Sequence, residues 1–197
     1  MIVTSSDRKV RLVSESGEVS TLINTSPFIP YGVCLNFKED IVVCLRGQDD
    51  RNHLALYIDG KLHKIRGRDS KGKRQITDPY KVVSCGKYLC VLIWNPIHVV
   101  CVDERSDVRW VYDGKVAGLR DSFDPRGISV DKYNNLLVTD YNNDCIHYVD
   151  GEGRLIQIIL THRQIGLLRP WGICVDNTGQ IWVGNSSKNV VICRYLS

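Results

Sequence analysis

One pattern, Pro-x-Gly-Ile-x-Val-Asp, recurs along the chain and constrains its fold more than any other feature. The two clearest copies begin at Pro125 and Pro170, and weaker copies begin at Pro30 and Pro79. Successive copies start 49, 46 and 45 residues apart. Each copy continues into a turn and further short apolar stretches. A period of this length, built from short apolar stretches, is typical of the blades of a β-propeller rather than of a sandwich.

The composition points to strands as well. The 197 residues include 23 Val and 18 Ile but only two Ala and one Met. Val and Ile are stiff at the first side-chain torsion and suit a pleated surface, whereas Ala and Met suit helices. We therefore predict an all-β protein, and the composition argues against a helical bundle.

The copy that begins at Pro125 predicts four antiparallel strands, over residues 127–130, 136–139, 145–149 and 154–160. Applied to the whole chain, this unit predicts a partial blade at 1–26, full blades at 27–75, 76–121 and 122–166, and a second partial blade at 167–197. This gives about eighteen strands, whereas six full blades would hold twenty-four. We interpret the chain as an incomplete part of a six-bladed ring, and a smaller closed ring is the alternative.

A polar residue precedes or opens the third strand of each copy, at Asn52, His98, Asp144 and Asn189. Together with the Pro-x-Gly copies, this resembles the NHL repeat, a family of mostly six-bladed β-propellers. The third copy departs from the pattern, with Lys81 in place of Gly and Cys85 in place of Asp. The spacing is also similar to that of the C-terminal propeller of tripartite-motif proteins, in which a RING finger, B-boxes and a coiled coil come first.

This resemblance implies a propeller that binds a protein substrate or adaptor for an E3 ubiquitin ligase, in protein ubiquitination and proteasomal degradation. Zinc and catalysis would belong to the RING and B-boxes, whose patterns are not in this chain, so we expect no cofactor here. The alternative is a regulator that binds single-stranded RNA through the same face. A propeller hydrolase or lyase is a third possibility, but the first strands carry Ile, Val, Ser and Cys where a metal site would need carboxylates or His.

The residue after each repeat proline is expected on the loop that enters the first strand, on one face of the propeller. These residues are Tyr31, Tyr80, Arg126 and Trp171. The loops between second and third strands open on the same face and add Trp94, Tyr141, Asn142 and Asn185. Such side chains can stack bases or anchor a peptide, or they can wedge between neighbouring blades. Asp140 is expected to cap its own turn.

The net charge of +4 is unevenly distributed. Between residues 61 and 74 there is one acid, Asp69, and a run that we call the basic segment: Lys61, Lys64, Arg66, Arg68, Lys71, Lys73 and Arg74. This run is interpreted either as a ridge for phosphate groups or as a solvated outer strand whose charges blunt a sheet edge.

The cysteines are Cys34, Cys44, Cys85, Cys90, Cys101, Cys145, Cys174 and Cys193. They sit mostly among Val, Ile and Leu, and no pair has the C-x-x-C spacing of a zinc or redox motif. We therefore expect buried, reduced thiols in a cytoplasmic protein, with no metal site. The five histidines lack metal-ligand spacing, and His98 and His147 are expected to be edge or inter-blade residues. The sequence shows neither a secretory signal nor an apolar run long enough to span a membrane, so no membrane partner is expected.

Overall fold

The structure is a computed structural model that describes residues 1–48, 51–65, 67, 69–116, 118–187 and 189–194. The chain divides into two compact units. Unit 1 comprises Met1–Pro96 and Val100–Arg109, and unit 2 comprises Ile97–Val99 and Trp110–Ser197. In the part of the chain that is described, no helix is long and apolar enough to cross a membrane.

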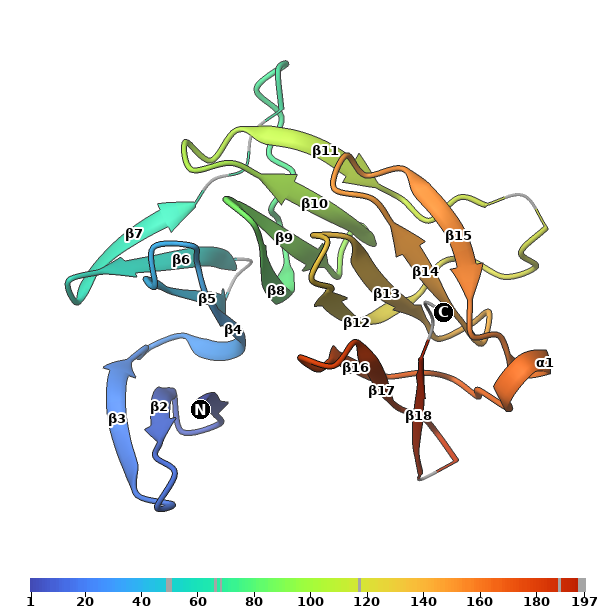
Figure 1. The fold of residues 1–197 in the computed structure, drawn as a ribbon. Coiled ribbons are helices and arrows are strands. Elements are labelled where there is room, and N and C mark those ends of the chain that lie inside the picture. Colours follow the sequence, from blue (N-terminus) through green and yellow to red (C-terminus); the bar gives the residue numbers. More distant parts are fainter. Residues whose placement is uncertain (49–50, 66, 68, 117, 188, 195–197) are drawn as a thin grey trace. The chain divides into compact units, whose positions relative to one another are not determined.

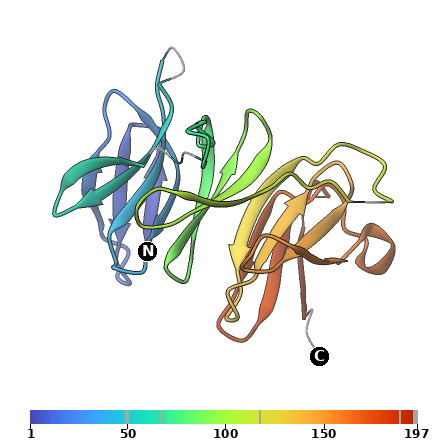
Figure 2. The ribbon, with the colours of Figure 1, turned by 90° about the horizontal axis from the view of Figure 1, so that it is seen from above.

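Within the described residues, the strands form five small antiparallel sheets, which we number as blades 1 to 5 along the chain (Figure 1, Figure 2). Blade 1 holds β1 (Ile2–Ser5), β2 (Lys9–Val13) and β3 (Val19–Asn24). Blade 2 holds β4 (Ile29–Leu35), β5 (Ile41–Arg46), β6 (His53–Ile58) and β7 (Lys61–Ile65). Blade 3 holds β8 (Pro79–Cys85), β9 (Tyr88–Ile93), β10 (His98–Val102) and β11 (Val108–Tyr112).

Blade 4 holds β12 (Pro125–Val130), β13 (Leu136–Asp140), β14 (Cys145–Val149) and β15 (Leu155–Ile159). A one-turn helix, α1 (His162–Ile165), precedes blade 5, which holds β16 (Gly172–Val175), β17 (Gln180–Gly184) and β18 (Val190–Arg194). In every blade each strand pairs with the next one along the chain. The all-β class is confirmed, and so are four-stranded antiparallel blades, although blades 1 and 5 have three strands.

An aspartate or asparagine opens many of the tight turns in the same way. Its Oδ1 accepts hydrogen bonds of 2.8–3.0 Å from the backbone N–H groups two and four residues later. The residues that do so are Asn36, Asp69, Asp103, Asp131, Asp150 and Asp176. Hydrogen bonds from Thr178 and Trp182 lower the pKa of Asp176 to about 2. The Asp that ends the repeat motif therefore has a structural role in its turn.

The first strands of blades 2, 3 and 4 each carry a bulge directly after the repeat proline. The pairing register shifts between Pro30 and Val33, between Pro79 and Lys81, and between Pro125 and Ile128. Tyr31, Tyr80 and Arg126 therefore lie inside a strand, at its bulge, and the prediction that they lie on the entering loop is wrong. A bulge redirects a side chain, and so it determines where these three residues point.

The glycine of the motif allows the first strand of the next blade to approach closely. A Cβ atom on Gly32 would lie 2.8 Å from the Cα of Lys81, and one on Gly127 would lie 2.6 Å from the carbonyl oxygen of Trp171. The equivalent Gly172 has no described atom within 4 Å of that position. At Gly32 and Gly127 the motif glycine is thus required by packing between blades rather than by its own turn.

Each unit has its own apolar core. The core of unit 1 includes Val42, Leu54, Ile76, Val91 and Ile93, and that of unit 2 includes Leu137, Ile146, Leu167, Ile181 and Val183. All eight cysteines are free thiols. Burial was overestimated for three of them, because Cys34 and Cys193 are half-buried and Cys174 is exposed. Even so, burial raises the pKa of Cys34 to about 12.

Candidate binding clusters and a buried polar group

Three of the predicted aromatic residues lie together in unit 1. The ring of Tyr80 is 5.7 Å from that of Tyr31 and 5.3 Å from that of Trp94, which follows β9. Arg46, at the end of β5, donates a hydrogen bond to the Tyr31 hydroxyl at 3.3 Å. We call Tyr31, Tyr80, Trp94 and Arg46 the Tyr80 cluster. Its rings are tilted against one another by 49° and 51°, so they pack partly on each other.

A second cluster lies in unit 2 around Arg126. The guanidinium group of Arg126 is 5.1 Å from the ring centroid of Tyr141 and 5.0 Å from that of Trp171, and it pairs with Asp124 at 2.7 Å. The guanidinium group of Arg169 also lies over the Tyr141 ring, 5.6 Å from its centroid. The rings of Tyr141 and Trp171 meet edge to face at 5.8 Å. We call Arg126, Tyr141, Arg169 and Trp171 the Arg126 cluster.

The repeat itself places the two clusters at equivalent positions in their blades. Trp94 and Tyr141 both follow a second strand, and their N–H groups donate to the carbonyl oxygens of Asp78 and Asp124 at 2.9 and 3.0 Å. Both aspartates come directly before a repeat proline. Because the first and second strands are fixed in this way, the residue after the proline and the residue after the second strand become neighbours.

Both clusters remain open to solvent. Trp171 is 47% exposed and Trp94 is 36% exposed, while the Arg126 side chain is 18% exposed. Six of the eight predicted binding residues are therefore in the two clusters. Three further residues at these clusters were not predicted from the sequence: Arg46, Asp124 and Arg169. The last two could have been found, since each directly precedes a repeat proline.

The two predicted asparagines make hydrogen bonds within loops. Asn142 donates through its Nδ2 to the carbonyl oxygen of Ser122 at 3.1 Å. The Oδ1 of Asn185 accepts from the N–H of Ser187 at 2.9 Å, and its buried Nδ2 has no hydrogen-bond partner among the described residues. These hydrogen bonds assign both asparagines to loop structure and not to either cluster.

The basic segment begins on β7, the last strand of blade 2, and continues into the turn around Asp69. Lys61, Lys71 and Lys73 are exposed, while Arg74 donates to the carbonyl oxygen of Asn52 at 2.6 Å. Arg66 and Arg68 lie outside the described residues, and of Lys64 only its place in β7 is described. In the sheet order β4-β5-β6-β7, β7 is the edge strand opposite β4, which carries Tyr31.

Unit 1 contains a cavity of about 240 Å³. It lies at the opposite end of the strands from the Tyr80 cluster. Its lining includes Leu56, Ile65 and Leu89, and the hairpin turns around it contribute Lys38 and Glu104, which pair at 2.8 Å. Apolar side chains thus line the inside of the cavity, and the Lys38–Glu104 ion pair lies at its border.

A fully buried polar group occupies blade 4, beneath the loop that joins β13 to β14. Asp140 caps that loop as predicted, because its Oδ1 accepts from the N–H of Asn143 at 3.4 Å and also from that of Asp124 at 3.2 Å. Its Oδ2 lies 3.1 Å from Nε2 of His147, whose Nδ1 is 2.7 Å from the Tyr112 hydroxyl. His147 is completely buried and contacts Tyr112 on β11 of blade 3, so of the two expected roles it has the inter-blade one and not the edge one.

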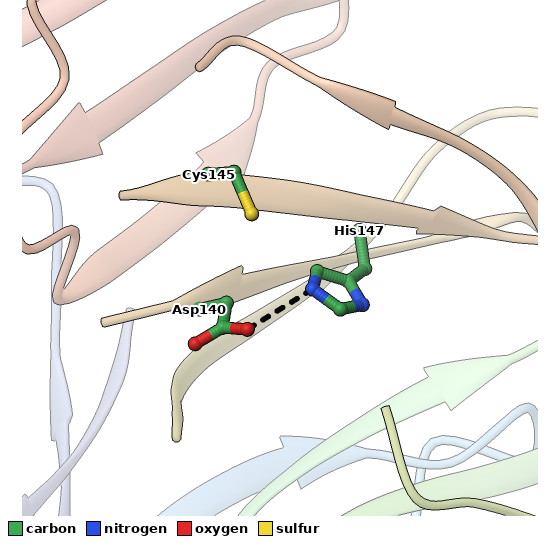
Figure 3. Close-up of side chains that lie close together, drawn as sticks. All are labelled: Asp140, Cys145 and His147. Carbon is green, nitrogen blue, oxygen red and sulfur yellow. Dashed lines mark hydrogen bonds and ion pairs between the residues drawn. The ribbon is translucent and has the colours of Figure 1, made fainter. Parts of the chain in front are cut away.

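Cys145 completes this group. It lies directly opposite Asp140 in the β13–β14 pairing, and its sulfur points toward the Asp140–His147 pair (Figure 3). Burial and the nearby Asp140 raise the pKa of the Cys145 thiol to about 12, and burial also raises the pKa of Tyr112. The sequence gives little signal for this group, because Cys-x-His preceded by an Asp five residues earlier is not a familiar ligand spacing.

The NHL repeat family matches residues 167–191, which run from the loop before β16 into β18. No curated protein matches the chain. The match supports an NHL-type repeat in blade 5, where the Pro-x-Gly-Ile-x-Val-Asp motif is clearest.

Several solved structures resemble the whole chain at low sequence identity. The WD40 β-propeller domain of Doa1 is 18% identical with a TM-score of 0.69, over 97% of this chain and 59% of that one. A virginiamycin B lyase from Staphylococcus aureus, solved with quinupristin, is 15% identical with a TM-score of 0.62, over 98% of this chain and 68% of that one. A chain of a nidogen/laminin complex is 13% identical with a TM-score of 0.59, over 98% of this chain and 88% of that one. These likenesses show the fold, a β-propeller of small antiparallel sheets.

Proposed function

We propose that this protein recognises a protein partner through the Arg126 cluster, with the Tyr80 cluster as a second contact. The observation that carries this proposal is the Arg126 guanidinium, held by Asp124 at 2.7 Å against the rings of Tyr141 and Trp171. Exposed Trp, Tyr and Arg side chains dominate the binding energy of protein interfaces. A preformed arrangement also loses less side-chain entropy when it binds.

Cationic side chains already lie over the aromatic rings of both clusters, and this favours a protein partner over unpaired bases. Base stacking needs an open aromatic face, and the guanidinium groups of Arg126 and Arg169 already lie over Tyr141. In the Tyr80 cluster, the ammonium group of Lys81 lies 5.4 Å from the Tyr80 ring centroid. Ring edges and guanidinium N–H groups remain, and these suit peptide carbonyls and apolar side chains.

Single-stranded RNA is the alternative partner, and the exposed lysines of the basic segment are the feature that favours it. However, the segment begins on β7, the edge strand opposite β4, which carries Tyr31. RNA bound along β7 would be separated from β4 by two strands. A strong fall of affinity with added salt would identify this mode, because phosphate contacts release counterions.

Peptide selection against the purified protein separates the two partner classes. Peptides from a displayed random library are expected to be enriched, to bind when labelled with fluorescein, and to lose little affinity in added salt. Labelled single-stranded RNA of about ten nucleotides, roughly one site on a single-strand binding fold, is the parallel arm. Salt-sensitive RNA binding without any enriched peptide would contradict the proposal.

We further propose that this recognition supplies substrates to a tripartite-motif-type E3 ubiquitin ligase in the cytoplasm, for ubiquitination and degradation. The Pro-x-Gly repeat and the NHL match at residues 167–191 support this finer proposal. Ligase chemistry would belong to a RING domain, and this chain would supply only recognition. Disrupting the gene should make the partner accumulate and lose ubiquitin, and an unchanged ubiquitination level would contradict the ligase role.

The third class, a propeller hydrolase or lyase, is not proposed. Among the described residues, the Asp140, Cys145 and His147 side chains form a group with catalytic chemistry, but all three are buried. A substrate could not reach them without opening the blade. Likeness of fold to a lyase carries no activity at this level of identity.

A further inference from the structure

We propose that Asp140, Cys145 and His147 form a binding site for a divalent transition-metal ion of the zinc class. Each side chain offers one ligand atom, and these three atoms all lie within 4.8 Å of one another. Figure 3 shows the Asp140 carboxylate on one strand and the Cys145 sulfur and His147 imidazole on the neighbouring strand, with the three side chains close together. Carboxylate oxygen, imidazole nitrogen and thiolate sulfur are the donors that zinc takes in proteins, usually in tetrahedral geometry.

Strand pairing fixes the three donors on one face of blade 4. Asp140 on β13 is the direct partner of Cys145 on β14. Cys145 and His147 are two residues apart on the same strand, and alternate residues of a strand share a face. The donors are therefore carried by a regular sheet, which is a more rigid support than a loop.

Among the described residues, such a set of donors is found in blade 4 alone. In blade 2, Leu45 is paired with Pro30 as Asp140 is paired with Pro125. The positions there that correspond to Asp140, Cys145 and His147 are occupied by Leu45, His53 and Ala55. Blade 2 therefore builds the same pairing with two apolar side chains. The fold does not require a carboxylate, a thiol and an imidazole at these places.

Hydrogen bonds from neighbouring residues already orient the proposed metal ligands. The Tyr112 hydroxyl lies 2.7 Å from Nδ1 of His147, which directs Nε2 toward Asp140. Nε2 and the Asp140 Oδ2 are 3.1 Å apart, so an ion can replace the hydrogen between them. The Nδ2 of Asn143 donates to the same oxygen at 2.8 Å and orients the carboxylate. Such outer partners orient metal ligands and tune their basicity.

Charge also favours a cation here. Asp140 and His147 are fully buried and Cys145 is 1% exposed, and a buried carboxylate is costly without a positive partner. The basic group in contact with this carboxylate is His147, at 3.1 Å, and a neutral imidazole supplies no positive charge. A divalent ion bound by the Asp140 carboxylate and the Cys145 thiolate gives a neutral centre, with the thiol proton released to solvent. Three protein donors leave the fourth tetrahedral position to a water molecule.

Cobalt(II) titration of the metal-free full chain tests this site, because cobalt replaces zinc and gives a thiolate charge-transfer absorption. We expect one equivalent of cobalt to produce this absorption and zinc to abolish it. Cys145→Ser should remove the absorption, whereas Cys174→Ser, which alters the exposed thiol, should leave it unchanged. Absence of the absorption in the wild-type chain, or its persistence in Cys145→Ser, would overturn the proposal.

A second variant keeps the test decisive if Cys145→Ser unfolds. Tyr112→Phe retains all three ligands and removes only the hydroxyl beside His147, so zinc affinity should fall by about 10-fold to 100-fold. Zinc should also raise the midpoint of thermal unfolding of the wild-type chain, since it binds the folded state. Zinc that neither raises the midpoint nor discriminates Tyr112→Phe from the wild type would contradict the site.

Discussion

Replacing Gly127 by alanine is expected to lower the free energy of unfolding of unit 2 by about 2–3 kcal/mol. The added Cβ would lie 2.6 Å from the carbonyl oxygen of Trp171 and 3.1 Å from the backbone nitrogen of Ile173. Both neighbours are backbone atoms, so the clash cannot be relieved by a side-chain rotation. The first strands of blades 4 and 5 must move apart, and the apolar contacts between them loosen.

Gly172→Ala is the matched control, because it changes the same motif position where no described atom lies within 4 Å. There the substitution should be neutral or slightly stabilising, since alanine restricts the unfolded chain more than glycine does. Urea unfolding followed by tryptophan fluorescence measures both, and Trp110, Trp171 and Trp182 all report on unit 2. Equal effects of the two substitutions would contradict the role of Gly127 in packing between blades.

Asp140→Ala is expected to cost about 3–5 kcal/mol, the range found when one partner of a buried polar pair is removed. The change leaves the N–H groups of Asp124 and Asn143, the Asn143 amide and His147 without their acceptor. All of these groups surround a carboxylate that is completely buried. The cost is therefore mainly that of unsatisfied donors, with a cavity added to it.

Asp140→Asn separates these contributions, because asparagine has nearly the same volume and keeps one acceptor oxygen. We expect it to lose less than half of the stability that Asp140→Ala loses. Measurements on metal-free protein keep the result independent of the proposed ion. If the two variants unfold at the same urea concentration, or if Asp140→Ala costs under about 1 kcal/mol, the hydrogen-bonded group does not stabilise blade 4.

Local patterns explain why much of the fold could be predicted from the sequence. The Asp residues that end the motif, Asp131 and Asp176, accept hydrogen bonds from N–H groups two and four residues later, and this geometry depends only on the turn itself. The alternation of short apolar stretches and turns likewise identified the antiparallel strands. Burial, in contrast, depends on residues that are distant in the sequence. The Ile and Val neighbours of Cys174 suggested a core position, but its side chain is exposed.

The candidate sites were only partly predictable, since they depend on pairing between strands. The variable position after the proline identified Tyr31, Tyr80 and Trp171, but the bulges that direct the first two follow from register and not from residue type. Arg46 joins its cluster from the end of another strand. The Asp140–His147 contact requires β13 and β14 to pair in one particular register, which the repeat spacing alone does not specify.

The Arg126 cluster is the proposed protein-binding surface. The most direct measurement is the affinity of Trp171→Ala and Trp182→Ala for a selected fluorescein-labelled peptide. Trp171 directly precedes β16 and Trp182 lies on β17, and they are 47% and 39% exposed. Trp182 donates a hydrogen bond to Asp176 and lies outside the cluster. We predict that Trp171→Ala weakens binding by about 30-fold or more, a loss typical of an interface hot spot, and that Trp182→Ala changes it by less than about 3-fold. Unchanged affinity in Trp171→Ala, in a variant that still folds, would contradict the claim.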